Sequence, residues 1–237
     1  KELPYFAAEV LPRLARLEPD LGTFTFDGEV SIRIGITETL DQIVLNAAEI
    51  DIKTTTLSGE DGETAVTGVT YDDEYSRATL TLEHPVAPGT YTLGITYIGI
   101  INDQLRGLYR SIYRDEDGAE HVIATSQCQA TDARRVLPCW DEPDLKATFK
   151  TAMVVADGLE AYANGAEVSR STLDDGRVRF EFTETMKMST YLLAFIAGPC
   201  EATDPVSSKH TAILILVPHG NLHLTALALE NAVFCFE

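Results

Sequence analysis

Residues 23–36 read TFTFDGEVSIRIGI, and apolar and polar side chains alternate along this stretch with a period of two. The apolar residues that share one face are Phe24, Phe26, Val30, Ile32, Ile34 and Ile36. Such alternation predicts strand structure with one face packed against a core. The Asp27-Gly28 step predicts a turn or a bulge, which would divide the stretch into a pair of strands.

Similar alternating runs continue along the chain and are separated by turn sequences. They occupy residues 42–46, 51–57, 65–71, 78–82, 90–98, 108–113, 121–125, 147–155, 160–164, 177–183, 190–197 and 211–217. The sequence DEDG at residues 115–118 predicts a hairpin between two of these runs. Because no helical period separates the strands, we expect an antiparallel sandwich or a curved sheet instead of βαβ units.

Helical spacing is confined to two segments. Residues 130–135 predict a short turn, and residues 221–236 carry apolar side chains at near-helical intervals at Leu222, Leu229, Val233 and Phe236. The fold class that the sequence predicts is therefore all-β. We expect a curved, saddle-like antiparallel β-sandwich followed by a short C-terminal helix.

The charge balance of the chain argues against nucleic acid as a partner. Its 237 residues include 18 Lys and Arg against 37 Asp and Glu, which gives a formal net charge of −19. Binding to a phosphate backbone depends on clustered basic residues, and the sequence has no such cluster. There is also no run of about 18 apolar residues, so we expect no membrane span.

The four cysteines, Cys128, Cys139, Cys200 and Cys235, are scattered along the chain and form no CxxC pair. Four are too few to form the disulfide framework of a chain this long. This pattern favours free thiols in a reducing compartment.

Common catalytic signatures are missing from the sequence, including GxSxG, GxGxxG and HExxH. The nearest metal-like spacing is His219 and His223, which would share one face if they lay on a helix. Pro218 and Gly220 disfavour a helix there, and no third ligand is evident. We therefore interpret residues 219–223 as a polar loop that leads into a helix, with a zinc site as the minor alternative.

The strongest candidate site lies in residues 127–149, which read QCQATDARRVLPCWDEPDLKATF. Alternation at a strand end predicts that Gln127 and Gln129 point the same way, with Cys128 on the opposite face. Side-chain amides both donate and accept hydrogen bonds, so two of them can hold a peptide or an ammonium group without adding charge. The charged residues between Asp132 and Glu142 are interpreted mainly as ion pairs that fix the following loop.

This block closely resembles the corresponding block of the zinc aminopeptidase N family, especially its puromycin-sensitive and fungal cytosolic members. Further matching stretches lie in the family's order at residues 19–28, 42–46, 50–52, 107–113 and 188–195. The resemblance therefore extends over nearly the whole chain. Residues 162–165 depart from the family pattern, and the similarity weakens after Pro218.

The resemblance implies a domain organisation and a substrate class. Residues 1–218 would form the N-terminal β-saddle domain, and residues 219–237 would begin a truncated thermolysin-like catalytic domain with its first helix. The complete enzyme would be a zinc-dependent, cytoplasmic aminopeptidase that removes N-terminal residues from peptides. Because its GAMEN and HExxH motifs are absent here, this chain would hold neither catalytic nor zinc-ligating residues and would be inactive alone.

The resemblance also assigns roles to the two glutamines. Gln129 matches the position where most members have a Glu that binds the α-amine of the peptide, and Gln127 matches a Gln that lines the pocket for the first side chain. An amide at residue 129 lacks the carboxylate charge and would attract an ammonium group less strongly. The alternative from a different class is a freestanding acidic β-sandwich that binds a protein or a peptide by strand addition or through its charged face.

Overall fold

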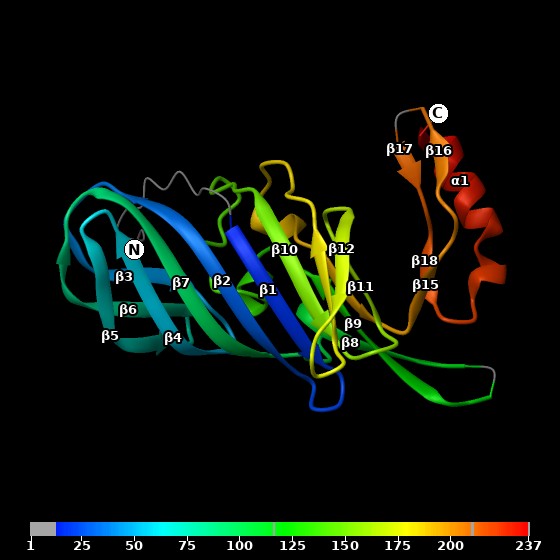
Figure 1. Cartoon of the computed structure of the whole chain (residues 1–237), viewed down its shortest axis with the longest axis horizontal. Helices are drawn as coiled ribbons and strands as arrows, with labels where there is room; N and C mark the ends of the chain where they lie inside the picture. Colours follow the sequence, from blue (N-terminus) through cyan, green and yellow to red (C-terminus); the bar gives the residue numbers. More distant parts are fainter. Residues whose placement is uncertain (1–12, 116, 210, 237) are drawn as a thin grey trace.

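The computed structural model describes residues 13–115, 117–209 and 211–236, and most of them lie in β-strands (Figure 1). The strands of the first half are β1 (Arg13–Asp20), β2 (Thr25–Ile36), β3 (Leu40–Asn46), β4 (Ile50–Gly59), β5 (Gly62–Asp72), β6 (Arg77–Val86) and β7 (Gly89–Ile100). Those that follow are β8 (Gly107–Arg114), β9 (Glu120–Gln127), β10 (Phe149–Val155), β11 (Glu160–Ala163), β12 (Glu167–Thr172), β13 (Val178–Phe182), β14 (Phe195–Gly198), β15 (Cys200–Ala202), β16 (Val206–Ser208), β17 (Thr211–Ile213) and β18 (Leu216–Pro218). Short 3-10 turns occur at η1 (Ala133–Arg135), η2 (Thr190–Leu192) and η3 (Leu222–Leu224), and the helix is α1 (Ala226–Phe236). The predicted all-β fold with a short C-terminal helix is confirmed.

A ten-stranded, strongly curved sheet forms the main body (Figure 1). Its strand order is β12-β13-β10-β1-β2-β7-β4-β5-β6-β3. Neighbouring strands are antiparallel except β1 and β10, which run parallel from Arg13 opposite Phe149 to Leu17 opposite Met153. The alternation of apolar residues gives no indication of this parallel pair.

In strand β2 the predicted buried face is confirmed, whereas the predicted interruption is not. The predicted apolar face from Phe26 to Ile36 is buried. The turn or bulge predicted at Asp27-Gly28 was wrong, because β2 continues through both residues and pairs with β7 along its whole length. Gly28 lies opposite Tyr97, and a Cβ atom at Gly28 would overlap the Tyr97 ring. The glycine makes room for a buried aromatic ring and does not mark a turn.

A smaller sheet of four strands, in the order β11-β14-β9-β8, carries the predicted hairpin. Strands β8 and β9 pair from Gly107 opposite Gln127 to Arg114 opposite Glu120. The far end of this hairpin extends away from the main body (Figure 1). Its other end, at Gln127, runs into the segment that carries the candidate site.

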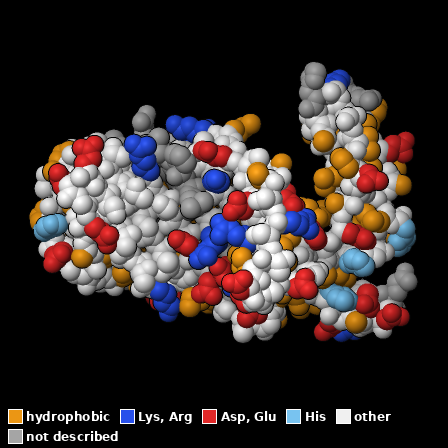
Figure 2. Space-filling view, in the orientation of Figure 1, with side chains coloured by type: hydrophobic (Ala, Val, Ile, Leu, Met, Phe, Trp, Pro, Cys, Tyr) orange, Lys and Arg blue, Asp and Glu red, His pale blue; other side chains and the backbone are white. Residues whose placement is uncertain are grey.

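The last part of the described chain forms a lobe at one end of the molecule (Figure 1). It contains the two-stranded sheets β15-β18 and β16-β17, and α1 packs against β16 and β17. Hydrophobic side chains gather on the surface of this lobe in Figure 2. Those exposed on η3 and α1 include Leu224, Leu227 and Phe234, with 66%, 69% and 77% of their surface accessible.

Two predicted strands differ from the observed elements. Residues 190–197 begin with the 3-10 turn η2 and become strand only at Phe195. The Thr190 hydroxyl donates a hydrogen bond to the Asp141 carboxylate, and the Ser189 hydroxyl donates one to the carbonyl of Pro143. These long-range hydrogen bonds override the local strand pattern. Residues 211–217 form two short strands, β17 and β18, with different partners.

Several basic side chains on the surface pair with acidic ones. On the face shown in Figure 2, Lys and Arg side chains lie beside Asp and Glu side chains. Arg177, for example, contacts both Glu18 at 2.7 Å and Asp175 at 2.8 Å. No helix among the described residues is both long and apolar enough to cross a bilayer.

Thiol labelling provides a direct test of the core. Cys128, Cys139 and Cys200 are buried and Cys235 is exposed. Burial raises the pKa of Cys128, and it raises the pKa of Cys200 from 9.0 to about 11. Because the thiolate is the reactive form, we expect a maleimide at pH 8 to modify the folded chain once, at Cys235, and the urea-unfolded chain at all four cysteines. Mass spectrometry of the native chain and of Cys235→Ser, which should remain unmodified, checks this, and fast labelling of a second native thiol would contradict it.

The raised pKa of Cys200 also links its burial to pH. The unfolded thiol loses its proton first, so the stability that burial of the neutral thiol provides is present below pH 9 and is lost as the pH rises through about 11.

Candidate functional site

Gln127 and Gln129 lie at the end of β9 and in the turn that follows it. Both residues are exposed, whereas Cys128 between them is buried. This burial pattern agrees with the predicted alternation, in which the two amides share one face. The peptide bond between Gln129 and Ala130 is cis.

The two amides are available to a ligand. Within the part of the chain that the structure describes, neither side chain hydrogen-bonds to another residue. Each amide presents one carbonyl oxygen as an acceptor and one NH2 group as a donor. Together they can hold a group that both donates and accepts, such as the amine and first peptide unit of a peptide.

A tight turn holds the backbone beneath these amides. The amide of Asp132 donates to the carbonyl of Cys128 at 2.9 Å, and Arg135 Nε donates to Asp132 Oδ1 at 3.0 Å. Arg135 also contacts Glu49 Oε2 at 2.6 Å, which joins the turn to the loop after β3. Burial lowers the pKa of Arg135, but its hydrogen bonds to Glu49 and Asp132 raise it more, so the net pKa lies above its ordinary value.

Gly107 explains how the turn approaches β8 so closely. It pairs with Gln127, and its φ of 58° lies in the left-handed region that favours glycine. A Cβ atom there would overlap the Cβ of Arg135. The glycine therefore allows the turn to pack directly on the strand pair.

A second group of contacts is centred on Asp141, 12 residues beyond Gln129 in the sequence. Its carboxylate is buried and accepts hydrogen bonds from Arg134 Nε at 3.0 Å and from the Thr190 hydroxyl at 2.6 Å. Its backbone amide donates to Asn46 Oδ1 at 3.1 Å. The sequence predicted an ion-pair network between residues 132 and 142, but the contributions of Asn46 and Thr190 carried no local signal.

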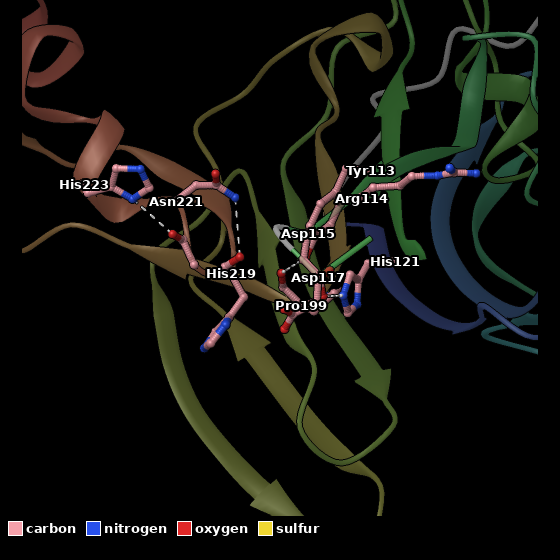
Figure 3. Close-up of a pocket in the computed structure, with 10 residues that line it drawn as sticks. Tyr113, Arg114, Asp115, Asp117, His121, Pro199, His219, Asn221 and His223 are labelled. Atoms are coloured by element: carbon pink, nitrogen blue, oxygen red, sulfur yellow. Dashed lines mark hydrogen bonds and ion pairs between the residues drawn. The ribbon is translucent and has the colours of Figure 1, made fainter. Parts of the chain in front are cut away.

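The two histidines considered as zinc ligands occupy a different part of the molecule. His219 follows β18 and His223 lies in the 3-10 turn η3, before α1 begins. In Figure 3 their rings point in different directions, and His223 Nδ1 is 3.2 Å from the carbonyl of Gly220. Among the described residues, no group of three His, Cys, Asp or Glu side chains can hold a metal ion. The favoured interpretation, a polar loop leading into a helix, agrees with this geometry.

These histidines line a hollow of about 520 Å³ between the tip of the β8–β9 hairpin and the C-terminal lobe (Figure 3). His121 lies on the opposite wall, where it contacts Asp115 Oδ2 at 2.7 Å and stacks on Tyr113. The Tyr113 hydroxyl donates to the carbonyl of Pro199 at 3.3 Å. The first two contacts lie within the hairpin, and the third joins it to Pro199, which directly precedes β15. All three lie at the opposite end of β9 from Gln127.

The sequence model of the family described as "Peptidase M1 N-terminal domain" matches residues 13–192, which include β1, the ten-stranded sheet and the segment with both glutamines. The chain belongs to this family. The M1 N-terminal domain thus accounts for all of the described structure up to η2.

Curated relatives agree with this assignment. The puromycin-sensitive aminopeptidase of Caenorhabditis elegans is 32% identical over 239 residues, which cover 100% of this chain and 25% of the worm protein. Aminopeptidase M1-A of rice is 33% identical and covers 98% of this chain, and the alanine/arginine aminopeptidase of Saccharomyces cerevisiae is 35% identical and covers 77%. The match spans 26% of the rice protein and 21% of the yeast protein. The chain thus spans about a quarter of the length of these relatives.

Proposed function

We propose that this chain is the substrate-holding N-terminal part of a zinc-dependent aminopeptidase that removes N-terminal residues from peptides. The observation that carries the proposal is the pair of exposed, uncommitted amides of Gln127 and Gln129 at a strand end inside an M1 N-terminal domain. The carbonyl oxygen of Gln129 accepts hydrogen bonds from the α-ammonium group of the peptide. Gln127 lies against the first side chain, so the two residues fix which peptide bond is presented for cleavage.

Catalysis itself is assigned to a partner domain. Zinc would supply an activated water molecule in the complete enzyme, but the residues present here do not fit a zinc site: the sequence has no HExxH, and the described residues include no metal-binding group of three. The purified chain should therefore show no hydrolysis of an aminoacyl amide. Turnover that a chelator abolishes would contradict this assignment.

The exposed apolar surface of the C-terminal lobe is suited to packing against a catalytic domain. We place residues 1–218 in the β-saddle domain and the beginning of a thermolysin-like domain at residues 219–237. In this division, α1 packs on β16 and β17, which belong to the β-saddle domain, so the two parts are in direct contact. The exposed apolar side chains of η3 and α1, such as Leu227 and Phe234, provide a surface for its remaining elements to cover.

A cytoplasmic location is proposed because the four cysteines are free thiols, which suit a reducing compartment. Another yeast relative is named a mitochondrial aminopeptidase. Fractionation of cells that produce the tagged protein checks the location.

Peptide binding to the chain tests the role of Gln129. In an NMR titration, an unblocked dipeptide amide should shift the signals of residues 127–132, whereas its N-acetylated form should not. Gln129→Ala should weaken binding, and Gln129→Glu should strengthen binding of the unblocked peptide about fivefold, because a charged acceptor forms stronger hydrogen bonds with an ammonium group.

Gln42 provides the matched control, since it is also exposed but lies on β3 in the ten-stranded sheet. Gln42→Glu adds the same charge and should leave the affinity unchanged. Equal binding of the blocked and unblocked peptides would count against an amine site. A response of Gln42→Glu equal to that of Gln129→Glu would indicate an effect of net charge alone.

A further inference from the structure

The Asp141 carboxylate is the most buried charged group near the candidate site, with a side chain that is 1% exposed. Three donors converge on it: Arg134 Nε at 3.0 Å, the Arg134 backbone amide at 3.3 Å and the Thr190 hydroxyl at 2.6 Å. These donors come from η1 and η2, which are far apart in the sequence. The carboxylate therefore joins two turns that no strand pairing connects.

Both turns are linked by hydrogen bonds of neighbouring residues to the strand end that carries the glutamines. On one side, η1 contains Arg135 and adjoins Asp132, whose amide binds the Cys128 carbonyl. On the other side, η2 leads into β14, where the amide of Phe195 donates to the Ser126 hydroxyl at 2.8 Å. A displacement of either turn would therefore also shift the backbone next to Gln127 and Gln129, through the hydrogen bonds to Cys128 and Ser126.

A charged group at this position is not explained by stability alone. A buried ion pair often adds little net stability compared with well-packed apolar side chains, because both ions lose their hydration. The two Arg134 donors share Oδ2, whereas the Thr190 hydroxyl donates to Oδ1. A carboxylate accepts all three hydrogen bonds with the help of its charge, whereas an amide could accept only the two at Oδ2, and without charge assistance.

We infer that Asp141 is a positioning residue for the substrate site, which it serves by holding η1 and η2 so that Gln129 presents its amide to the peptide amine. The inference rests on the proposed function for its biological meaning. The geometric part, that Asp141 sets the position of Gln129, stands independently of any ligand.

The geometric part is tested on the ligand-free chain. Asp141→Asn should shift the backbone and side-chain NMR signals of Gln129 and speed hydrogen exchange of the Asp132 amide by about tenfold, since loss of one charged acceptor loosens the turn. Glu160→Gln is the control, because it removes a carboxylate that pairs with Arg170 at 3.0 Å, while Glu167 remains as a second partner of the same arginine. A purely structural role would lower the urea midpoint of Asp141→Asn without moving the Gln129 signals of the folded state, and that result would overturn the inference.

Thr190 offers a second, milder pair of variants in case Asp141→Asn does not fold. Thr190→Val keeps the shape but removes the hydroxyl, whereas Thr190→Ser keeps the donor to Asp141. The valine variant should move the Gln129 signals and the serine variant should not. Equal spectra for the two variants would also overturn the inference.

Peptide affinity then separates the two claims. Asp141→Asn should weaken binding of the unblocked dipeptide amide about tenfold and Thr190→Val about threefold, whereas Thr190→Ser and Glu160→Gln leave it unchanged. If the wild-type chain does not bind the peptide, the proposed function fails while the ligand-free spectra still decide the role of Asp141. If the wild type binds and Asp141→Asn binds equally well, the positioning role is wrong and the proposed function stands.

Discussion

Replacing Trp140 with Ala is expected to lower the free energy of unfolding by about 4 kcal/mol, because the change removes a large buried ring and leaves a cavity. Trp140 is the largest fully buried side chain described, at 1% exposure. Its Nε1 donates to the carbonyl of Val44 at 2.9 Å, so the variant also leaves that carbonyl without its indole donor. The indole thereby connects the loop around Asp141 to β3.

Urea denaturation followed by circular dichroism measures this loss, since Trp140 is the only tryptophan and the variant has no indole fluorescence. Trp140→Phe should lose less stability, because much of the ring volume remains. Leu227→Ala, at a side chain that is 69% exposed, should change the stability by less than about 0.5 kcal/mol. A loss below about 1 kcal/mol for Trp140→Ala would show that the site collapses freely and that the ring is not a packing centre.

Gly28→Ala should cost about 2 to 3 kcal/mol, although alanine normally suits a strand better than glycine does. The added methyl group would overlap the buried ring of Tyr97. That ring has little freedom to move, since its hydroxyl donates to the carbonyl of Val136 at 2.9 Å. The strands β2 and β7 must then separate, or the tyrosine must abandon its hydrogen bond.

Gly68→Ala is the matched control for this substitution. Gly68 also lies within a strand, β5, but a Cβ atom there has no neighbour within 4 Å. Its change in stability, measured by the same urea denaturation, should stay within about 0.5 kcal/mol of zero. Equal losses for the two variants would mean that glycine itself, and not the space above Gly28, determines the effect.

Much of the fold could be predicted from the sequence because most strands bury one face. Alternation identified the apolar face of β2 and the β8–β9 hairpin, whose turn sequence also gave the connection. Strand β12, in contrast, was missed because all six of its residues are exposed and no alternation marks them. The position of β12 in the sheet is determined by its pairing with β13. The conformation of residues 190–192 likewise depends on a residue distant in the sequence, because Thr190 hydrogen-bonds to Asp141.

In the candidate site, too, some features could be predicted from the local sequence and others could not. The period of two predicted that Gln127 and Gln129 share one face opposite Cys128, and the exposure of both glutamines and the burial of Cys128 agree with that prediction. Their substrate role came from a resemblance and stays a prediction. The convergence of Arg134, Thr190 and Asn46 on Asp141 depends on segments up to 95 residues apart, so local patterns could not reveal it.

The parallel pairing of β1 with β10 has a consequence for the order in which the protein folds during synthesis. Strands β2 to β7 have partners within residues 25–100, so they can complete their pairing once β7 has left the ribosome. Arg13 must wait for Phe149, and only then can β10, β13 and β12 join the sheet. Until that moment one edge of β1 is open to other chains, so dilute nascent chains should fold more efficiently than concentrated refolding mixtures.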